Sequence, residues 1–260
     1  MQNLVLQTQN LKVGYTKGKN MVWSVSIPDL PISTGQFVGI LGANGAGKST
    51  FLKSLLGSLL PLDGTIRLQD KPITDWDVQE KAKVMSAVLT EAIPKTQLTV
   101  LELVALGRLP HTSWIGKLSE EDEQKVTEAL TLVRMADFAH KKVYELSDGQ
   151  LQKVMIARCL AQDTPLVLLD EPTSHLDLVH KVSVFKLLQQ LAKEQGKTIL
   201  FSSHDLDLCL QFCDQVLLFT PKGVYFDEPC NLISEGVFHD LFQEEDVTFD
   251  ASTGKFLVKK

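Results

Sequence analysis

Residues 39–50 read GILGANGAGKST and match the pattern G-x-x-x-x-G-K-[S/T] at Gly42, Gly47, Lys48 and Ser49. The apolar stretch 37–42 before the pattern is typical of a strand, and residues 48 to 59 are typical of a helix, which is the context the pattern requires. Glycines let successive backbone N–H groups face a phosphate, and a helix N-terminus adds partial positive charge. The stretch therefore predicts a phosphate-binding loop rather than a glycine-rich turn that only packs a strand on a helix.

Each residue type in this loop has an expected task. Lys48 is expected to reach the β- and γ-phosphates, and the Ser49 hydroxyl is expected to bind Mg²⁺. The loop alone does not distinguish kinases, GTPases and motor ATPases. The predicted phosphate-binding set comprises Gly42, Ala43, Asn44, Gly45, Ala46, Gly47, Lys48, Ser49 and Thr50.

A second acidic motif, LVLLDEPTSHLD at 166–177, supplies carboxylates. Asp170 ends an apolar strand and fits the Mg²⁺-holding carboxylate found beside phosphate loops. Glu171 follows directly and is a candidate general base that polarises the attacking water. His204 ends the next predicted strand, and ligands gather at the carboxyl ends of parallel strands, so it is expected to contact the γ-phosphate and orient Glu171. The alternatives are two surface acids and a solvated histidine.

Strand and helix patterns alternate along much of the chain, which predicts an α/β fold with a mostly parallel sheet. An antiparallel β-subdomain is expected near the N-terminus, a helical insertion at about 90–165, and a hairpin plus a short helix in a C-terminal extension at about 221–260, all within one domain spanning 1–260. The expected strands are 4–13, 22–27, 37–42, 64–70, 165–170, 197–203 and 215–220, and the expected later helices are 98–109, 119–138, 178–195 and 205–213.

Composition limits the possible partners. The chain has 260 residues, 44% of them hydrophobic, and a net charge of −6, which does not favour nucleic acid or anionic lipid as a partner. Its four cysteines form no C-x-x-C pair, so reduced, mostly buried thiols are expected. No signal peptide is apparent, and no apolar run approaches the roughly 20 residues that span a bilayer. Any membrane function is expected to go through a partner.

The stretch LSDGQLQKVMIAR at 146–158 opens a helix but has no lysine where a phosphate would require one. Ser147 and Gln150 fit an N-terminal capping box, in which each side chain bonds the backbone N–H of the other residue. The stretch therefore serves its own helix alone, or it also serves a nucleotide that another molecule binds.

Taken together, these motifs resemble the ATPase subunits of ABC transporters over residues 4 to 220. The matching order runs through the phosphate loop, LSDGQ at 146–150, LVLLDE at 166–171, SHLD at 174–177 and His204. The resemblance implies that Tyr15 stacks on adenine and that two subunits form a head-to-tail homodimer. It also implies that one chain contacts the ATP of its partner through Ser147, the Gly149 N–H, Gln150 and Asp177.

Within the insertion, VALGRLPHTSWIGKLSEEDE at 104–123 is similar to importers of ferric siderophores, haem or cobalamin. This resemblance implies integral membrane permease partners, an indirect role for a substrate-binding protein, and a peripheral position at the cytoplasmic face of the inner membrane. An ABC ATPase without a channel, such as an iron–sulfur assembly scaffold, remains an alternative. A kinase or GTPase is disfavoured because no N-K-x-D guanine motif is present.

The chain departs from this family at two positions. Thr90, followed by Glu91, occupies the position where the family has a Mg²⁺-contacting glutamine, and either residue offers an oxygen ligand. Asp148 replaces the commonest glycine of the signature. A carboxylate facing a γ-phosphate would be repelled, so the Asp148 side chain is expected to point away, and acid in a first helical turn is otherwise favourable.

Overall fold

The computed structural model describes residues 3–18, 20–89, 96–112, 116–174, 176–241, 247–250 and 255–258. Its centre is a six-stranded sheet in which five strands are parallel and the edge strand β11 is antiparallel. The expected α/β class with a mostly parallel sheet is therefore confirmed. In spatial order the strands are β11 (Gly223–Asp227), β10 (Gln215–Thr220), β4 (Phe37–Gly42), β9 (Thr198–Ser202), β8 (Leu166–Leu169) and β7 (Met85–Val88).

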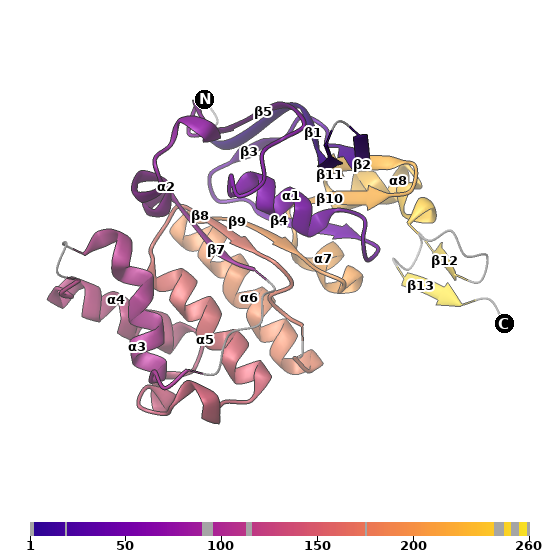
Figure 1. Ribbon diagram of the computed structural model, residues 1–260. Helices are drawn as coiled ribbons and strands as arrows, with labels where there is room; N and C mark the ends of the chain where they lie inside the picture. The colour runs from indigo at the N-terminus through magenta and orange to yellow at the C-terminus, as the bar shows by residue number, and fades with distance from the viewer. Residues whose placement is uncertain are drawn as a thin grey trace.

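A second, antiparallel sheet covers one face of the first, with helix α1 (Lys48–Leu55) between them (Figure 1). The apolar side chains of α1, including Phe51, Leu52 and Leu55, join one buried cluster with residues of both sheets. The phosphate loop therefore leads into a helix that is fixed from two sides. The strands of this sheet are β1 (Leu4–Lys17), β2 (Asn20–Ser26), β3 (Pro31–Ser33), β5 (Asp63–Leu68) and β6 (Lys71–Pro72).

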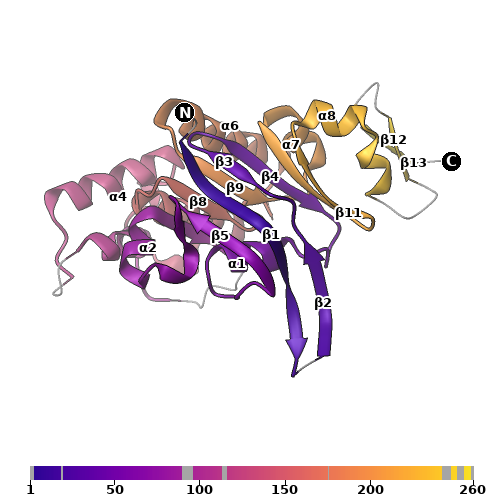
Figure 2. The ribbon, with the colours of Figure 1, turned by 90° about the horizontal axis from the view of Figure 1, so that it is seen from above.

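Helices cover the opposite face of the parallel sheet. Figures 1 and 2 show the helices of the insertion gathered beside the β7–β8 end of the sheet, and α6 and α7 nearer its middle. Among the described residues, no helix is long and apolar enough to cross a membrane. The helices are α3 (Val100–Ala105), α4 (Glu120–Leu132), α5 (Asp148–Ala161), α6 (Leu178–Gln195) and α7 (Leu206–Phe212).

The apolar strands are explained by burial on both faces. In β4, Phe37 and Leu41 pack into the cluster beneath the helices, whereas Val38 and Ile40 pack into the cluster around α1. Successive side chains of a strand point to opposite faces, so a strand between two layers needs apolar residues at every position. The sequence run 37–42 has this composition.

Several expected boundaries shift for local reasons. The helix expected at 48–59 ends at Leu55. The expected helix 98–109 ends at Ala105 and continues as a 3₁₀ turn, where Gly107 passes so close to the Arg158 carbonyl that a Cβ would overlap it. The expected helix 119–138 ends at Leu132, because Arg134 turns the chain with a φ of 58°.

The short strands β3 and β6 were not expected, and neither were the short helix α2 (Val78–Val84) and strand β7. Helix α2 and β7 are contiguous, so no glycine or proline separates the helical pattern from the strand pattern in the sequence. The C-terminal extension contains the expected short helix, α8 (Pro229–Ser234), and the expected hairpin of β12 (Val247–Asp250) and β13 (Lys255–Val258).

A buried ion pair joins three parts of the insertion. Arg108 Nε donates to Asp122 Oδ1 at 2.8 Å, and these side chains are only 6% and 7% exposed. Another guanidinium nitrogen of Arg108 donates to the Ala161 carbonyl at the end of α5. Hydrogen bonds from Ser119 at the start of α4, together with Arg108, lower the pKa of Asp122 to about 2. The pair therefore links the 3₁₀ turn, α4 and α5.

We expect Asp122→Ala to destabilise the chain by about 3–5 kcal/mol at pH 7, because it leaves the buried Arg108 guanidinium without its carboxylate. Urea unfolding monitored by circular dichroism measures this change. Since folding lowers the pKa of Asp122 from 3.8 to about 2, its contribution is present above pH 4 and is lost as the pH falls toward 2. A variant as stable as wild type at pH 7 would contradict this role.

Candidate nucleotide site

Three neighbouring parallel strands deliver the predicted residues to one edge of the sheet. Strand β9 lies between β4 and β8, so their carboxyl ends lie side by side. The phosphate loop follows β4, Asp170 and Glu171 follow β8, and His204 follows β9. Local sequence pattern and sheet order together therefore bring these residues to one place.

The phosphate loop ends at Gly47, the residue before the first turn of α1. Gly47 has a φ of 108°, which only glycine adopts without strain, and a Cβ there would overlap the indole of Trp23. The Phe51 N–H bonds the Gly47 carbonyl, so the helix begins directly at the loop. Glycine is thus required at this position by both backbone conformation and space.

Lys48 lies within the loop rather than in solvent. Its Nζ donates to the carbonyl oxygens of Gly42 at 2.8 Å and Ala43 at 3.1 Å, and the residue is 6% exposed. Burial lowers the pKa of Lys48, while the nearby Glu171 and Asp170 carboxylates oppose that effect. The arrangement gives the loop a desolvated ammonium, which attracts an anion more strongly than a solvated one.

Asp170 connects the phosphate loop to the two neighbouring strand ends. Ser49 Oγ and Ser202 Oγ both donate to Asp170 Oδ1, at 3.2 and 2.6 Å. Ser202 Oγ in turn accepts the Glu171 N–H at 2.9 Å, and the Asp170 N–H bonds the Val88 carbonyl. The hydroxyl of Ser49 and the carboxylate of Asp170 are hard oxygen donors, so they are suited to Mg²⁺.

Glu171 and His204 form a direct pair. His204 Nε2 lies 2.8 Å from Glu171 Oε1, and the side chains are 44% and 28% exposed. Glu171 has a φ of 51°, a left-handed conformation that costs a non-glycine residue of order 1–3 kcal/mol and is concentrated at functional sites. The geometry therefore brings the carboxylate that follows β8 together with the imidazole that follows β9.

A second hydrogen-bonded group holds the loop after His204. Asp205 accepts from Thr173 Oγ1 at 3.0 Å and from Lys181 Nζ at 2.7 Å. Thr173 follows Glu171 by two residues and Lys181 lies in the first turn of α6. The strand ends of β8 and β9 are thereby connected a second time, outside the predicted residue set.

Tyr15 lies beside the phosphate loop, with its hydroxyl 3.2 Å from Thr50 Oγ1. It is paired across strands with Trp23, and the ring centroids are 6.5 Å apart. Both aromatics line a cavity of about 280 Å³ together with Lys48, Ser49 and Glu171. The lining combines aromatic rings with a cation and hydroxyls, which suits a nucleotide.

The residues expected to act on a partner's nucleotide lie elsewhere. Ser147 and Gln150 form the expected capping box at the start of α5, with Gln150 N to Ser147 Oγ at 3.3 Å and Ser147 N to Gln150 Oε1 at 3.0 Å. Asp177 caps α6 and also accepts from His180. Neither these residues nor Gly149 line the phosphate cavity of their own chain.

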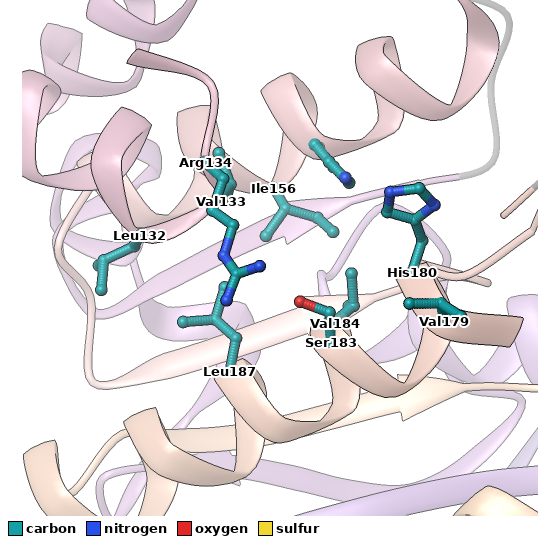
Figure 3. Close-up of a pocket in the computed structure, with 10 residues that line it drawn as sticks. Leu132, Val133, Arg134, Ile156, Val179, His180, Ser183, Val184 and Leu187 are labelled. Atoms are coloured by element: carbon teal, nitrogen blue, oxygen red, sulfur yellow. The ribbon is translucent and has the colours of Figure 1, made fainter. Parts of the chain in front are cut away.

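A separate cavity of about 130 Å³ lies between the insertion helices and α6 (Figure 3). Arg134, which follows α4, and His180, from the first turn of α6, line it together with the apolar side chains of Ile156 from α5 and Val184 from α6. No residue of the predicted nucleotide set lines this cavity.

Some site residues were missed from the sequence, and others lie outside the described residues. Trp23 carries no motif, although its position opposite Tyr15 in a hairpin is a usable signal. Ser202 sits two residues before His204 in a strand, where serine reads only as a small residue. Thr90 and Glu91, the two candidates for the metal-linked position, lie outside the described residues. Among the residues that the structure does describe, no three His, Cys, Asp or Glu side chains form a metal cluster.

The fold and this edge of the sheet define a P-loop nucleotide-binding protein of the ATPase class. A profile of the ABC transporter family matches residues 26–174, which is more than half of the chain. The chain belongs to the ABC transporter family and is one of its ATPases.

Relatives of known name match this chain over nearly its whole length. The chain is 36% identical to the petrobactin import ATP-binding protein FpuD of Bacillus anthracis, covering 92% of this chain and 87% of the relative. It is also 36% identical to the iron(3+)-hydroxamate import ATP-binding protein FhuC of Bacillus subtilis, covering 96% of this chain and 92% of the relative. Names of this kind do not favour a scaffold protein without a channel.

The solved structures that resemble this chain are also ABC transporters or their ATP-binding cassettes. An inward-facing metal-chelate type ABC transporter superposes with a TM-score of 0.79 at 30% identity, over 92% of this chain and 89% of that chain. A dimeric ATP-binding cassette in a post-hydrolysis state, bound to ADP and phosphate, superposes with a TM-score of 0.72 at 30% identity, over 86% of this chain and 98% of that chain. The expected class of ABC ATPase is therefore confirmed.

We expect Ser202→Ala to lower the kcat for ATP hydrolysis about tenfold, because it removes the hydroxyl that joins Asp170 to the Glu171 N–H and so misplaces both carboxylates. Ser202→Thr retains a hydroxyl and is the matched control, expected to keep most activity. Phosphate release measured at saturating ATP tests the pair. Full activity in Ser202→Ala would show that this hydroxyl does not position the site.

Proposed function

We propose that this ATPase energises the import of an iron complex, such as a ferric siderophore or haem, or of cobalamin. It would act as a homodimer beneath integral permease subunits at the cytoplasmic face of the inner membrane, and a binding protein would deliver the cargo to the permease. The names of the relatives from the two Bacillus species support this cargo class. The observation that carries the ATPase role is the contact of His204 with Glu171, because Glu171 lines the same cavity as Lys48 and Ser49.

ATP would lie along the cavity between the aromatics and the phosphate loop. Tyr15 would stack on adenine, the loop N–H groups from Gly42 to Thr50 would surround the phosphates, and Lys48 would leave its two carbonyl partners to meet the β- and γ-phosphates. Ser49 and Asp170 would hold Mg²⁺, and either Thr90 or Glu91 would add a ligand. The bound ion would neutralise charge on the phosphate oxygens.

Glu171 would accept a proton from the attacking water. A carboxylate does this best when it is held in one orientation, and the 2.8 Å contact with His204 supplies that restraint. His204 would also contact the γ-phosphate, which would make the pair sensitive to bound nucleotide. Lys48, Glu171 and His204 form the proposed catalytic set.

A second copy of the chain would complete the nucleotide-binding site. Ser147, Gly149, Gln150 and Asp177 would face the ATP of the partner in a head-to-tail dimer. Their position outside the cavity of their own chain supports this arrangement. Ser147 can serve both roles, because its capping bond uses one lone pair of the hydroxyl and leaves the O–H free to donate.

Uptake of labelled compounds by cells tests the proposed cargo. Deleting the gene should abolish accumulation of one labelled chelate among ferric siderophore, haem and cobalamin, and a wild-type copy should restore it while Lys48→Ala does not. Manganese is the necessary comparison, because the chain is also 33% identical to the manganese transport ATP-binding protein MntB of Listeria monocytogenes. Loss of manganese uptake alone would contradict the proposal.

Glu171→Gln should bind ATP but hydrolyse it at least about a hundredfold more slowly, because an amide cannot accept the proton from water. The trapped species should be an ATP-bound dimer, which gel filtration with ATP and Mg²⁺ detects. A monomer peak together with full turnover would remove Glu171 from the proposed catalytic set.

Mixing two inactive variants tests the shared site. Lys48→Ala damages the phosphate loop and Ser147→Arg damages the signature, so a mixed dimer contains one doubly damaged site and one intact site. Random pairing makes about half of the dimers mixed, so activity should return to at most roughly a quarter of wild type if sites act independently. A tag pull-down verifies subunit exchange. Verified mixed dimers with no activity above either parent, even with the permease present, would count against a shared site.

A further inference from the structure

The C-terminal extension returns to the nucleotide edge of the sheet. After β11 and α8, Gly236 turns the chain with a φ of 73°, and a 3₁₀ turn over Val237–Asp240 leads to Leu241. Leu241 is 3% exposed, although it lies in a segment outside the region that carries the motifs. Figure 2 shows α8 and the terminal hairpin beside α7, the helix that follows His204.

Leu241 lines a cavity that it shares with both predicted catalytic loops. This cavity has a volume of about 230 Å³ and its remaining lining residues are Gly42, Ala43, Asn44, Ser203, His204 and Leu206. Among the described residues beyond β10, Leu241 alone belongs to this lining. The C-terminal extension therefore forms one wall of the space between the phosphate loop and the His204 loop.

The His204 loop depends on its neighbours for its position. The imidazole is 44% exposed and bonds Glu171, and α7 begins at Leu206 without a side-chain cap, because Asp205 is engaged by Thr173 and Lys181. These polar bonds hold one side of the loop. Leu206, the first residue of α7, is partly buried against the apolar cluster that contains Leu241, and both residues line the cavity.

An aromatic pair fixes Leu241 in turn. Phe238, in the 3₁₀ turn, stacks on Phe249 of β12 with ring centroids 5.0 Å apart and an interplanar angle of 29°. Both rings are almost fully buried. Stacked buried rings of this kind resist displacement, so the turn that carries Leu241 is held as a rigid unit. An ion pair between Asp240 and Lys222 adds a second attachment, to the turn between β10 and β11.

We propose that Leu241 is a positioning residue for His204, and that the C-terminal extension fixes the orientation of the Glu171–His204 pair through it. The inference rests on the proposed roles of Glu171 and His204. Leu241 touches neither nucleotide nor water in this scheme. It acts as the C-terminal wall of the cavity beside the His204 loop, which limits how far the loop can move and keeps the imidazole within reach of Glu171.

The test compares Leu241→Ala with Leu232→Ala in the full-length chain. Leu232 is 1% exposed and lies in α8 of the same extension, but it does not line the cavity. Single-turnover hydrolysis of labelled ATP, measured with the enzyme in saturating excess, should be about tenfold slower in Leu241→Ala than in wild type. The Kd for ATP should change less than about twofold. Leu232→Ala should keep the wild-type rate at temperatures where it remains folded. Leu241→Met, which replaces the side chain by one of similar size, should retain most of the wild-type rate.

The same substitution in a His204→Ala background separates positioning from general loosening. If Leu241 acts through His204, Leu241→Ala should slow that variant by less than about twofold, since coupled residues are not additive. An equal tenfold loss in both backgrounds, or an equal loss in Leu232→Ala, would overturn the inference while leaving the proposed function intact. Full activity in His204→Ala would instead overturn the proposed role of His204 together with this inference.

Discussion

The carboxylate of Asp170 is the point on which the nucleotide site depends. It accepts hydrogen bonds from Ser49, which follows β4 through the phosphate loop, and from Ser202, the last residue of β9. Ser202 also holds the Glu171 N–H. One acidic side chain at the end of β8 thereby connects three strand ends, and the parallel order of those strands is what brings the three within reach.

The layers around the sheet must bury both of its faces to hold these strand ends in place. A parallel sheet buried on both faces needs apolar residues at every strand position, and the two clusters on either side of β4 supply them. The antiparallel sheet fixes α1 from one side and brings Tyr15 and Trp23 to the loop. The insertion helices are held together by the buried Arg108–Asp122 pair, and Ser147 caps the start of one of them, α5.

The features predicted from sequence are those encoded within a few residues. The phosphate loop, the acidic end of β8 and the Ser147 capping box each need only local spacing, and all are present. Ser202, Asp205 and the Arg108–Asp122 pair were not predicted, because their partners are 14 to 32 residues away and the bonds exist only after the layers pack. Strand β7 was missed for a different reason, since it follows α2 without a break.

The most direct test of the central role of Asp170 is titration calorimetry of ATP binding with and without Mg²⁺. Wild type should bind ATP more tightly when Mg²⁺ is present, because Asp170 and Ser49 offer the ion oxygen ligands beside the phosphates. In Asp170→Asn, which preserves shape but removes the charge, this gain should fall at least about tenfold. A variant that retains the full gain from Mg²⁺ would contradict the account.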